Sequence, residues 1–295
     1  MATPPDASAG VLGGVRNRRR LATAGFYVLL SLIGVLFMFP WFWTLTGSLK
    51  SPSEVYVFPP AWLPKTLRFD NYPKVFEIVP FARFFRNSVV VVSLASLGNV
   101  TSATLVAYAF ARFRWRGRDA IFAITLATMM LPAEVTLIPQ YLLYKQLGWL
   151  NTIRPLWVPA WFGGGAFSIF LLRQFILTLP REFDEAATID GANPLRILVA
   201  VLLPLMKPVL ATITVITLIA GWDDFMGPLI YLASPETFTL ALGLRYFSVT
   251  HGQPGTPTLH LLMAACIMST SPIVLLFFVA QRYFVQGIVM SGLKG

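Results

Sequence analysis

Few residues in this chain have the types and spacing that covalent chemistry requires. Asp223 and Asp224 follow an apolar run, and neighbouring carboxylates can act as an acid and a base. Successive residues on a helix point about 100° apart, however, so we expect one of these charges to be hydrated. Because no pattern of nucleophile, base and orienting group accompanies them, the sequence predicts no catalytic residue.

Metal, redox and nucleotide chemistry are also sparsely supplied. Cys266 is the single cysteine and lies in an apolar run, so no intrachain disulfide can form. His251 and His260 are too few for a His-rich metal site, and we expect both side chains to be solvated or to cap a helix. No Walker loop (GxxxxGK followed by Ser or Thr) occurs, so we expect no cofactor on this chain and no ATP hydrolysis by it.

The most specific local signals lie in a polar segment, residues 179–194, between two apolar runs. Pro180 suits the first position of a helix, and Gly191 suits a position of positive φ after its end. Asn193 and Pro194 suit the N-cap and first residue of another helix. The segment therefore predicts a short helix, a sharp turn and a second helix.

The composition places these segments in a membrane protein. Apolar residues make up 56% of the 295 residues and charged residues 12%, against about 25% charged in soluble proteins. Mean hydropathy is +0.68. The formal net charge of +10 could indicate nucleic-acid binding, but the basic residues cluster between apolar runs instead of forming one tract. We interpret them as topology signals and expect no nucleic-acid partner.

Six runs are candidates for membrane-spanning helices, because a span needs about 20 mainly apolar residues. The first is too long for a signal peptide, with no charged residue from Leu21 to Leu49. One run contains Pro132, Glu134 and Pro139, so we expect it to break there, with Glu134 at an interface or, as an alternative, in a transport pathway. The six are Leu21–Thr46, Asn87–Ala111, Ala120 to about Tyr144, Pro155–Leu172, Leu205–Trp222 and Leu259–Ala280.

Arginine clusters orient these spans. Four arginines lie in residues 112–119, and four more lie in residues 16–20 before the first span. The positive-inside rule then places segments 1–20, 112–119, 173–204 and 281–295 in the cytoplasm, although the loop of residues 50–86 also carries six Lys or Arg. Trp157 and Trp161 would then be aromatic-belt residues at the external end of the fourth span, with stacking on a sugar ring as the alternative.

A short cytoplasmic helix clamped between two spans moves only with those spans. A partner that grips it would therefore transmit rigid-body motion into the membrane. For an arbitrary membrane protein, the plain alternative is an interfacial connector helix.

A longer pattern favours the coupling interpretation. The run Glu185-Ala-Ala-Thr-Ile-Asp-Gly-Ala192, followed by Leu203-Pro204 and Pro208, resembles the EAA motif of permease subunits in ATP-binding-cassette (ABC) importers. Further segments cover most of residues 21–295 and resemble the MalG-type subunit of carbohydrate importers. They are Asn87-Ser88, Ala107-Tyr-Ala-Phe-Ala-Arg112, Trp222-Asp-Asp-Phe225 and Gln281-Arg-Tyr-Phe284. One departure is Asp223, where the family often has Asn.

The resemblance implies roles for three groups of residues. In that family the EAA helix docks in a cleft of the ATPase subunit, and the C-terminal tail reaches between the ATPase subunits; a frayed terminus is the alternative for the tail. The segment after the fifth span is a candidate pathway or gate, and a structural role or direct sugar contact are its other interpretations. The residues are Glu185, Ala186, Ala187, Asp190, Gly191 and Pro204 for coupling, Trp222, Asp223, Asp224 and Phe225 for the pathway or gate, and Gly292, Lys294 and Gly295 for the tail.

These observations predict an all-α integral membrane protein with six transmembrane helices, a type I ABC importer permease fold and a cytoplasmic coupling helix at about 180–192. A cytoplasmic tail (1–20) precedes the permease domain (21–284), and a second tail (285–295) follows it. The resemblance implies a bacterial or archaeal inner membrane, cytoplasmic termini and transport of a sugar. It also implies a second permease subunit, two ATPase subunits that bind ATP and Mg²⁺, and an extracytoplasmic solute-binding protein.

Two rival functions stay open. An importer for phosphate, amino acids or peptides would share the EAA segment but not the Trp222 and Gln281-Arg282 segments. A secondary transporter or channel would need intramembrane charges for ion coupling, and the first two spans are free of charge.

Overall fold

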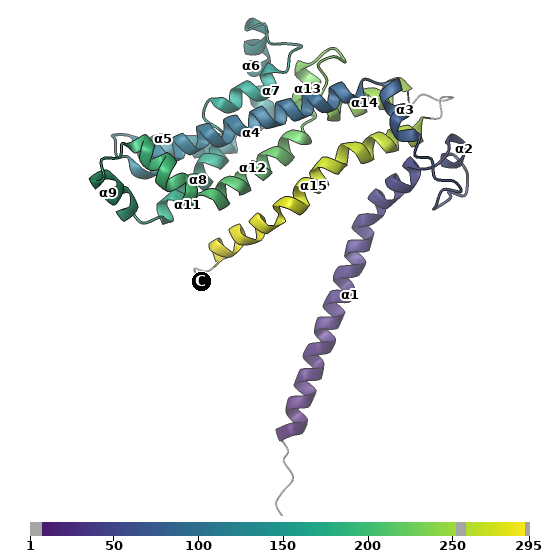
Figure 1. The fold of residues 1–295 in the computed structure, drawn as a ribbon, viewed down its shortest axis with the longest axis horizontal. Helices are drawn as coiled ribbons and strands as arrows, with labels where there is room; N and C mark the ends of the chain where they lie inside the picture. Colours follow the sequence, from purple (N-terminus) through teal and green to yellow (C-terminus); the bar gives the residue numbers. More distant parts are fainter. Residues whose placement is uncertain (1–7, 252–257, 293–295) are drawn as a thin grey trace, which may run out of the picture. The chain divides into compact units, whose positions relative to one another are not determined.

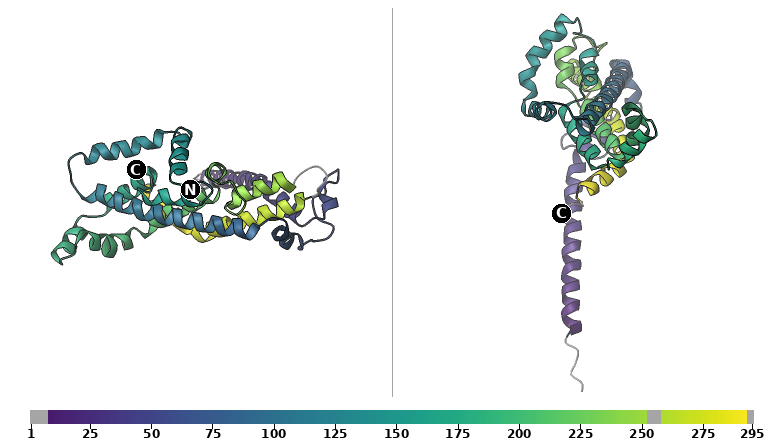
Figure 2. Two further views of the ribbon diagram at one scale, coloured as in Figure 1. Left: turned by 90° about the horizontal axis from the view of Figure 1, so that it is seen from above. Right: turned by 90° about the vertical axis from the view of Figure 1, so that its left-hand side faces the viewer.

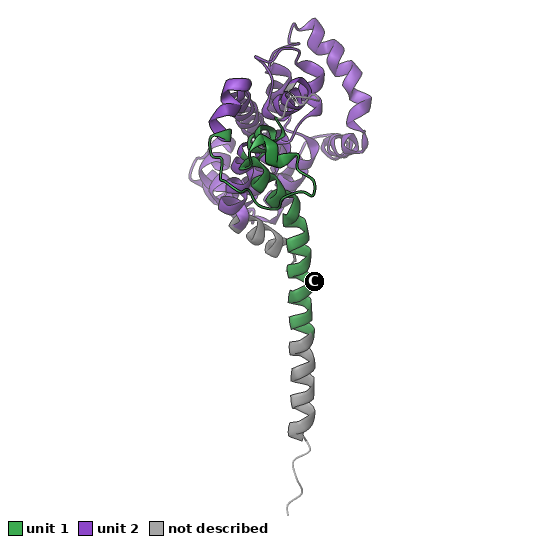
Figure 3. Cartoon of the chain, turned by 90° about the vertical axis from the view of Figure 1, so that its right-hand side faces the viewer, with its two compact units in different colours: residues 1–71, 257–267 green, residues 72–256, 268–295 purple. Residues whose placement is uncertain are grey.

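The computed structural model describes residues 8–251 and 258–292, with side chains described over 22–250 and 258–281. All regular secondary structure in those residues is helical. The chain forms two compact units (Figure 3): unit 1 holds residues 1–71 and 257–267, and unit 2 holds residues 72–256 and 268–295.

Three helices, α1, α4 and α15, exceed 30 residues, and the other helical elements are shorter (Figure 1). In chain order they are α1 (Ser8–Ser48), α2 (Pro52–Val55), α3 (Asn71–Ile78), α4 (Phe81–Arg112), α5 (Arg118–Ala127), the 3₁₀ turn η1 (Thr128–Met130), α6 (Ala133–Gln146), α7 (Arg154–Trp157), the 3₁₀ turn η2 (Val158–Trp161), α8 (Ala166–Thr178), α9 (Glu182–Ile189), α10 (Pro194–Arg196), the π-helical turn η3 (Ile197–Leu202), α11 (Leu203–Leu205), α12 (Lys207–Trp222), α13 (Met226–Tyr231), α14 (Leu240–His251) and α15 (Leu259–Gly292).

The membrane-spanning prediction is confirmed in type and position. Four helical stretches of the described chain are long and apolar enough to cross a bilayer, and two bent helix pairs bring the number to six if each pair is one span. The four are Ala22–Ser48, Phe81–Arg112, Arg154–Thr178 and Leu259–Gln281. The bent pairs are Arg118–Met130 with Ala133–Gln146, and Pro194–Leu205 with Lys207–Trp222. The protein is therefore an all-helical integral membrane protein.

The predicted break at Pro132 is confirmed. The two halves, Arg118–Met130 and Ala133–Gln146, meet at 100°, and Figure 2 shows them as separate rods joined by a sharp turn. Leu131 is extended, as expected for a residue before proline. Glu134 is exposed in the first turn of α6, where the positive end of the helix dipole stabilises a carboxylate.

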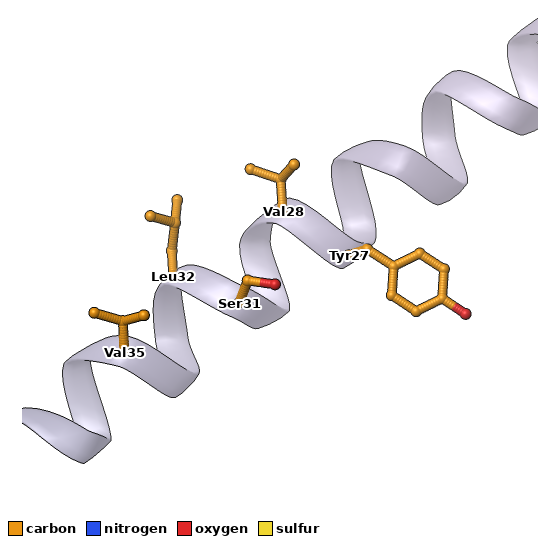
Figure 4. A pocket seen from close by; sticks show the side chains of 5 residues that line it. All are labelled: Tyr27, Val28, Ser31, Leu32 and Val35. Carbon is orange, nitrogen blue, oxygen red and sulfur yellow. The ribbon is translucent and has the colours of Figure 1, made fainter.

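In unit 1, α1 has almost no cover from its own chain over its apolar stretch. The most apolar window of Ala22–Ser48 has 0% of its residues buried. Val28, Leu32 and Val35 project from one side of the helix and Tyr27 from another (Figure 4). Apolar surface on every side suits lipid, whose hydrocarbon offers no hydrogen bonds, or the apolar face of a second membrane protein.

The loop after α1 in unit 1 is ordered by polar contacts. Asn71 is buried, and its amide donates to the carbonyls of Ser48 at 2.8 Å and Lys50 at 2.9 Å. The Glu54 carboxylate accepts hydrogen bonds from the backbone N–H groups of Ser51 at 2.9 Å and Lys65 at 3.0 Å. These bonds to the ionised form hold the pKa of Glu54 below its ordinary value.

Unit 2 is built around α4, which packs against α8 and α12 (Figure 1). Ala103, Ala107 and Ala111 recur at every fourth position of α4 and are buried, so one face of this helix is small enough for close approach. They share a hydrophobic cluster with Leu172 of α8 and Ile213 of α12. This cluster is the platform on which the candidate site stands.

The fourth span is interrupted by Gly163, Gly164 and Gly165, which all have positive φ. A Cβ at Gly164 would lie 2.5 Å from the Asn99 carbonyl oxygen of α4, so only glycine permits this approach. Just before the break, the Trp161 indole covers Gly98, well inside α4 and away from both its ends. The prediction that Trp161 is an aromatic-belt residue at the end of a span is therefore wrong.

Candidate functional site

The short polar helix that the sequence predicts is α9, which lies at one end of unit 2 (Figure 1). It begins at Glu182, two residues later than the Pro180 start that we predicted, and ends at Ile189. Its first turn contains Glu182, Asp184 and Glu185, and negative charge is favourable at this end of a helix dipole. The helix is thus shorter than the expected 180–192.

The predicted turn after α9 is confirmed in detail. Gly191 has φ +78°. The Gly191 N–H donates to the Thr188 carbonyl at 3.0 Å, and the Ala192 N–H donates to the Ala187 carbonyl at 2.9 Å. These two bonds are the Schellman pattern, which satisfies the last carbonyls of a helix and reverses the chain.

The second helix starts as predicted, at Asn193 and Pro194. The Asn193 side chain accepts a hydrogen bond from the Arg196 N–H at 2.8 Å, and Pro194 occupies the first helical turn. α10 then continues through η3 and α11 to α12, with an 81° bend at the junction between Leu205 and Lys207. Pro204 is exposed in this bend.

α9 has two faces of different character. Ala187 and Ala192 pack against the hydrophobic cluster of unit 2. On the other side, Glu185, Ala186 and Asp190 are exposed, as is Gly191. The exposed face also carries Ile189, which is 87% exposed. The sequence reasoning missed Ile189, although an isoleucine inside a polar segment was a usable signal.

A buried ion pair ties α9 to the end of α4, and it was also missed. The Arg112 guanidinium lies 3.0 Å from the Asp184 carboxylate, and the two side chains are 6% and 19% exposed. Arg112 also donates to the Leu179 carbonyl at 3.1 Å. Nothing local in the sequence pairs Arg112 with a residue so far along the chain; only the packing of α8 on α4 brings them together.

The candidate pathway or gate residues lie where α12 ends. Trp222 is the last residue of that helix; its indole N–H donates to the Ser269 carbonyl at 3.0 Å, and its ring meets Phe85 edge to face. Asp223 and Asp224 are exposed and lie beyond the helix, so the assumption that both stand on one helix is wrong. Asp224 accepts a hydrogen bond from the Gly227 N–H at 3.2 Å.

Phe225 is half-buried and directly precedes α13, in the loop that Asp224 helps to shape. The Asp224 carboxylate therefore has a structural partner, whereas Asp223 is the C-cap of α12 with an exposed side chain. The segment thus joins α12 to α13 through a fixed tryptophan and a capped loop.

Two further motifs from the sequence anchor the start of α4. The Asn87 amide donates to the Glu236 and Phe238 carbonyls, both at 3.0 Å. The Ser88 hydroxyl accepts a hydrogen bond from the Leu240 N–H at 2.7 Å. Both residues therefore fasten the segment before α14 to α4.

The remaining candidates are placed as follows. Gly292 is the last residue of α15, and the structure describes only its place in that helix. Lys294 and Gly295 lie outside the described residues. His260 is only 4% exposed, so solvation is wrong for this histidine, and the helix-capping alternative stays a prediction. The side chain of His251 lies outside the described residues. Among the described residues, no group of three or more His, Cys, Asp or Glu could hold a metal ion.

Residues 99–290 match the family described as the binding-protein-dependent transport system inner membrane component. The chain belongs to this family. The matched range contains both faces of α9, the Arg112–Asp184 pair and the Trp222–Phe225 segment. The coupling and gate candidates of this inner membrane component are therefore in its family-defining part.

Relatives of known name cover nearly the whole chain. AraQ, the arabinooligosaccharides transport system permease protein of Bacillus subtilis (strain 168), is 31% identical over 283 residues, with 94% of this chain and 96% of the relative covered. UgpE, the sn-glycerol-3-phosphate transport system permease protein of Escherichia coli O1:K1 / APEC, is 33% identical over 283 residues, with 94% of this chain and 99% of the relative covered. The resemblance to carbohydrate importer permeases is thus confirmed.

A solved structure has the same fold. A chain of a bacterial ABC transporter involved in the import of the acidic polysaccharide alginate superposes with a TM-score of 0.77 at 26% identity. The match covers 96% of this chain and 100% of that chain. The permease fold predicted from the sequence is therefore confirmed.

Proposed function

We propose that this permease is one of two such subunits in an ATP-driven importer, and that it forms half of the pathway for a sugar or a related compound. Its partners are a second permease subunit, two ATPase subunits that bind ATP and Mg²⁺, and an extracytoplasmic solute-binding protein. The family membership supports this assembly, and the relatives' names support a mono-, di- or oligosaccharide as the solute.

The observation that carries the proposal is the two-faced α9. One face is fixed to the core of unit 2 through Ala187 and Ala192, and the other presents Glu185 and Ile189 outward. A charged and an apolar side chain exposed together on a rigid helix fit a protein cleft better than bulk water. Closure of the ATPase pair around ATP would then move α9 and the spans that hold it, and so switch the side on which the pathway opens.

We place α9 and both termini in the cytoplasm of a bacterial or archaeal cell. The four arginines of residues 112–119 support this orientation, because they join α4 to α5 at the end of α4 where α9 lies. The Trp222–Phe225 segment, with Asp223 and Asp224 exposed, lies at the C-terminal end of α12, opposite the end that follows α9 and α10. The solute-binding protein would therefore approach from that end.

Co-purification tests the docking surface. Glu185→Lys should reduce recovery of the ATPase subunits with the tagged permease, since reversing a paired interface charge costs about 2 to 5 kcal/mol of association. Ile189→Ser should reduce it as well by removing an apolar contact. Glu77→Lys is the matched control: it makes the same charge reversal at an exposed acid of α3, outside α9, and we expect full recovery.

Equal recovery by all variants, together with unchanged solute uptake at matched membrane levels, would make α9 a plain connector.

The solute itself is identified by thermal-shift screening of the solute-binding protein, because a bound ligand stabilises the folded state. The UgpE similarity favours adding sn-glycerol-3-phosphate to the saccharides screened. Stabilisation only by amino acids or peptides would contradict the sugar assignment.

A further inference from the structure

The end of α4 contacts the chain on both sides of α9, as well as α9 itself. Arg112, the last residue of α4, donates to the Leu179 carbonyl at 3.1 Å, just before α9. It pairs with Asp184 within α9 at 3.0 Å. Tyr108, one turn earlier on α4, donates its hydroxyl to the Pro194 carbonyl at 3.1 Å, just after α9. α4 therefore holds this segment at three points, although it is remote from it in sequence.

The neighbouring acids Asp184 and Glu185 face different surroundings. Successive residues on a helix diverge by about 100°, so the two carboxylates cannot share one partner. Asp184 is 19% exposed beside Arg112, whereas Glu185 is exposed. The first therefore serves contacts within the permease, and the second is available to another protein.

The pairing is dry enough to act as a rigid connection. The Arg112 side chain is 6% exposed, and removing charge from water is unfavourable unless the partner stays in place. Water therefore competes poorly for either group while α4 and α9 stay in contact. A surface pair of the same geometry would exchange freely with solvent and would transmit little force.

We propose that the Arg112–Asp184 pair is a latch that makes α4 move together with α9. Chain connectivity links α9 to α8 on one side and to α10 on the other, and Ala187 packs against the hydrophobic cluster of unit 2. The latch adds a direct route from the coupling helix into α4, the central helix of unit 2. Arg112 and Asp184 are positioning residues in this scheme, and the inference rests on the proposed function because it requires an ATPase that moves α9.

The test compares solute uptake with ATP hydrolysis in proteoliposomes that contain the whole importer and its solute-binding protein. The double variant Arg112→Gln/Asp184→Asn removes both charges, so no buried charge is left unpaired and the chain is expected to fold. We expect normal recovery of the ATPase subunits and normal ATP hydrolysis, but solute moved per ATP should fall about fivefold or more. Glu77→Gln, which removes an exposed acid of α3 outside α9, should leave this ratio unchanged.

A covalent connection distinguishes a latch from a mere stabilising contact. In a Cys266→Ser background, Arg112→Cys/Asp184→Cys should be uncoupled until a short bifunctional thiol reagent joins the two cysteines, and should then regain transport per ATP. Unchanged transport per ATP in the double neutral variant, or no recovery after cross-linking, would overturn the latch. Failure of every Arg112 and Asp184 variant to accumulate, Asp184→Glu included, would assign the pair to folding and would also overturn it. Failure of the proposed function gives a different result, since the unmodified permease would then recover no ATPase.

Discussion

Substitutions at Gly191 distinguish the effect of backbone conformation from the effect of side-chain contacts in the turn after α9. Gly191 has φ +78°, and a Cβ built there meets no heavy atom within 4 Å. Any penalty within the permease therefore comes from the backbone alone. Left-handed conformation costs an ordinary L-residue about 1 to 2 kcal/mol. Valine should approach about 3 kcal/mol, because its branched side chain resists positive φ, whereas asparagine tolerates it.

Relief of this strain requires the turn to open. Opening would break the bonds from Gly191 to Thr188 at 3.0 Å and from Ala192 to Ala187 at 2.9 Å, each worth about 1 kcal/mol. The strain and the two bonds are therefore similar in size, so the valine variant should populate an open turn. α9 would then be misdirected even with every outward side chain present.

The assays are solute uptake at matched membrane levels and the rate of tryptic cleavage at Arg181 and Arg196, which flank the turn and are exposed. We expect activity to fall in the order Gly191→Asn, Gly191→Ala, Gly191→Val, with cleavage rising in the same order. Asparagine is larger than alanine, so steric conflict with a docked ATPase would reverse the first two. That reversal, or equal activity of the asparagine and valine variants, would refute the backbone argument.

Three further predictions address other parts of the chain. Gly164→Ala should lower the melting temperature of the detergent-solubilised protein more than Gly163→Ala. Both glycines have positive φ, but only at Gly164 does the new Cβ meet backbone, 2.5 Å from the Asn99 carbonyl oxygen, which adds about 1 to 3 kcal/mol of overpacking. Equal melting temperatures would contradict this. Glu54→Gln should speed tryptic cleavage at Lys65, because it weakens the hydrogen bond from the Lys65 N–H. The pKa of Glu54 is lowered on folding, so its ordering effect is present above the unfolded pKa and should be lost as pH falls through the folded pKa. A cleavage rate that does not depend on pH, after correction for trypsin activity, would contradict the assignment. In a Cys266→Ser background, Gly117→Cys should react with impermeant thiol reagents only from the cytoplasm and Pro60→Cys only from outside; the opposite pattern would invert the proposed topology.

The sequence predicted the local features of the fold well, because these depend on residue type and near neighbours. The apolar runs gave the spans, Pro132 gave the 100° break, and Gly191 and Asn193 gave a turn and a cap with the expected hydrogen bonds. The start of α9 was misplaced because Pro180 is compatible with a helix start without requiring one.

Features that depend on distant contacts could not be predicted in the same way. Trp161 looked like a belt residue until the glycine break brought its ring over Gly98. The pairing of Arg112 with Asp184 requires α8 to pack along α4, and no sequence spacing encodes that. The roles of Glu185, the Trp222 segment and the C-terminal tail stay predictions, because they concern surfaces that act only in an assembly.

Exposed apolar side chains in this permease have two different meanings. Along α1 they lie within a membrane span, where lipid covers them without penalty, so Leu36 and Phe37 do not distinguish lipid from a protein partner. Ile189 lies in α9, in the polar segment between the fourth and fifth spans, and is 87% exposed. In the proposed cytoplasmic position, contact with water is unfavourable by about 25 cal/mol per Å² of apolar surface, and lipid would not cover the side chain. The exposed apolar side chain of α9 is therefore the stronger indication of a protein partner, although its surface is far smaller than that of α1.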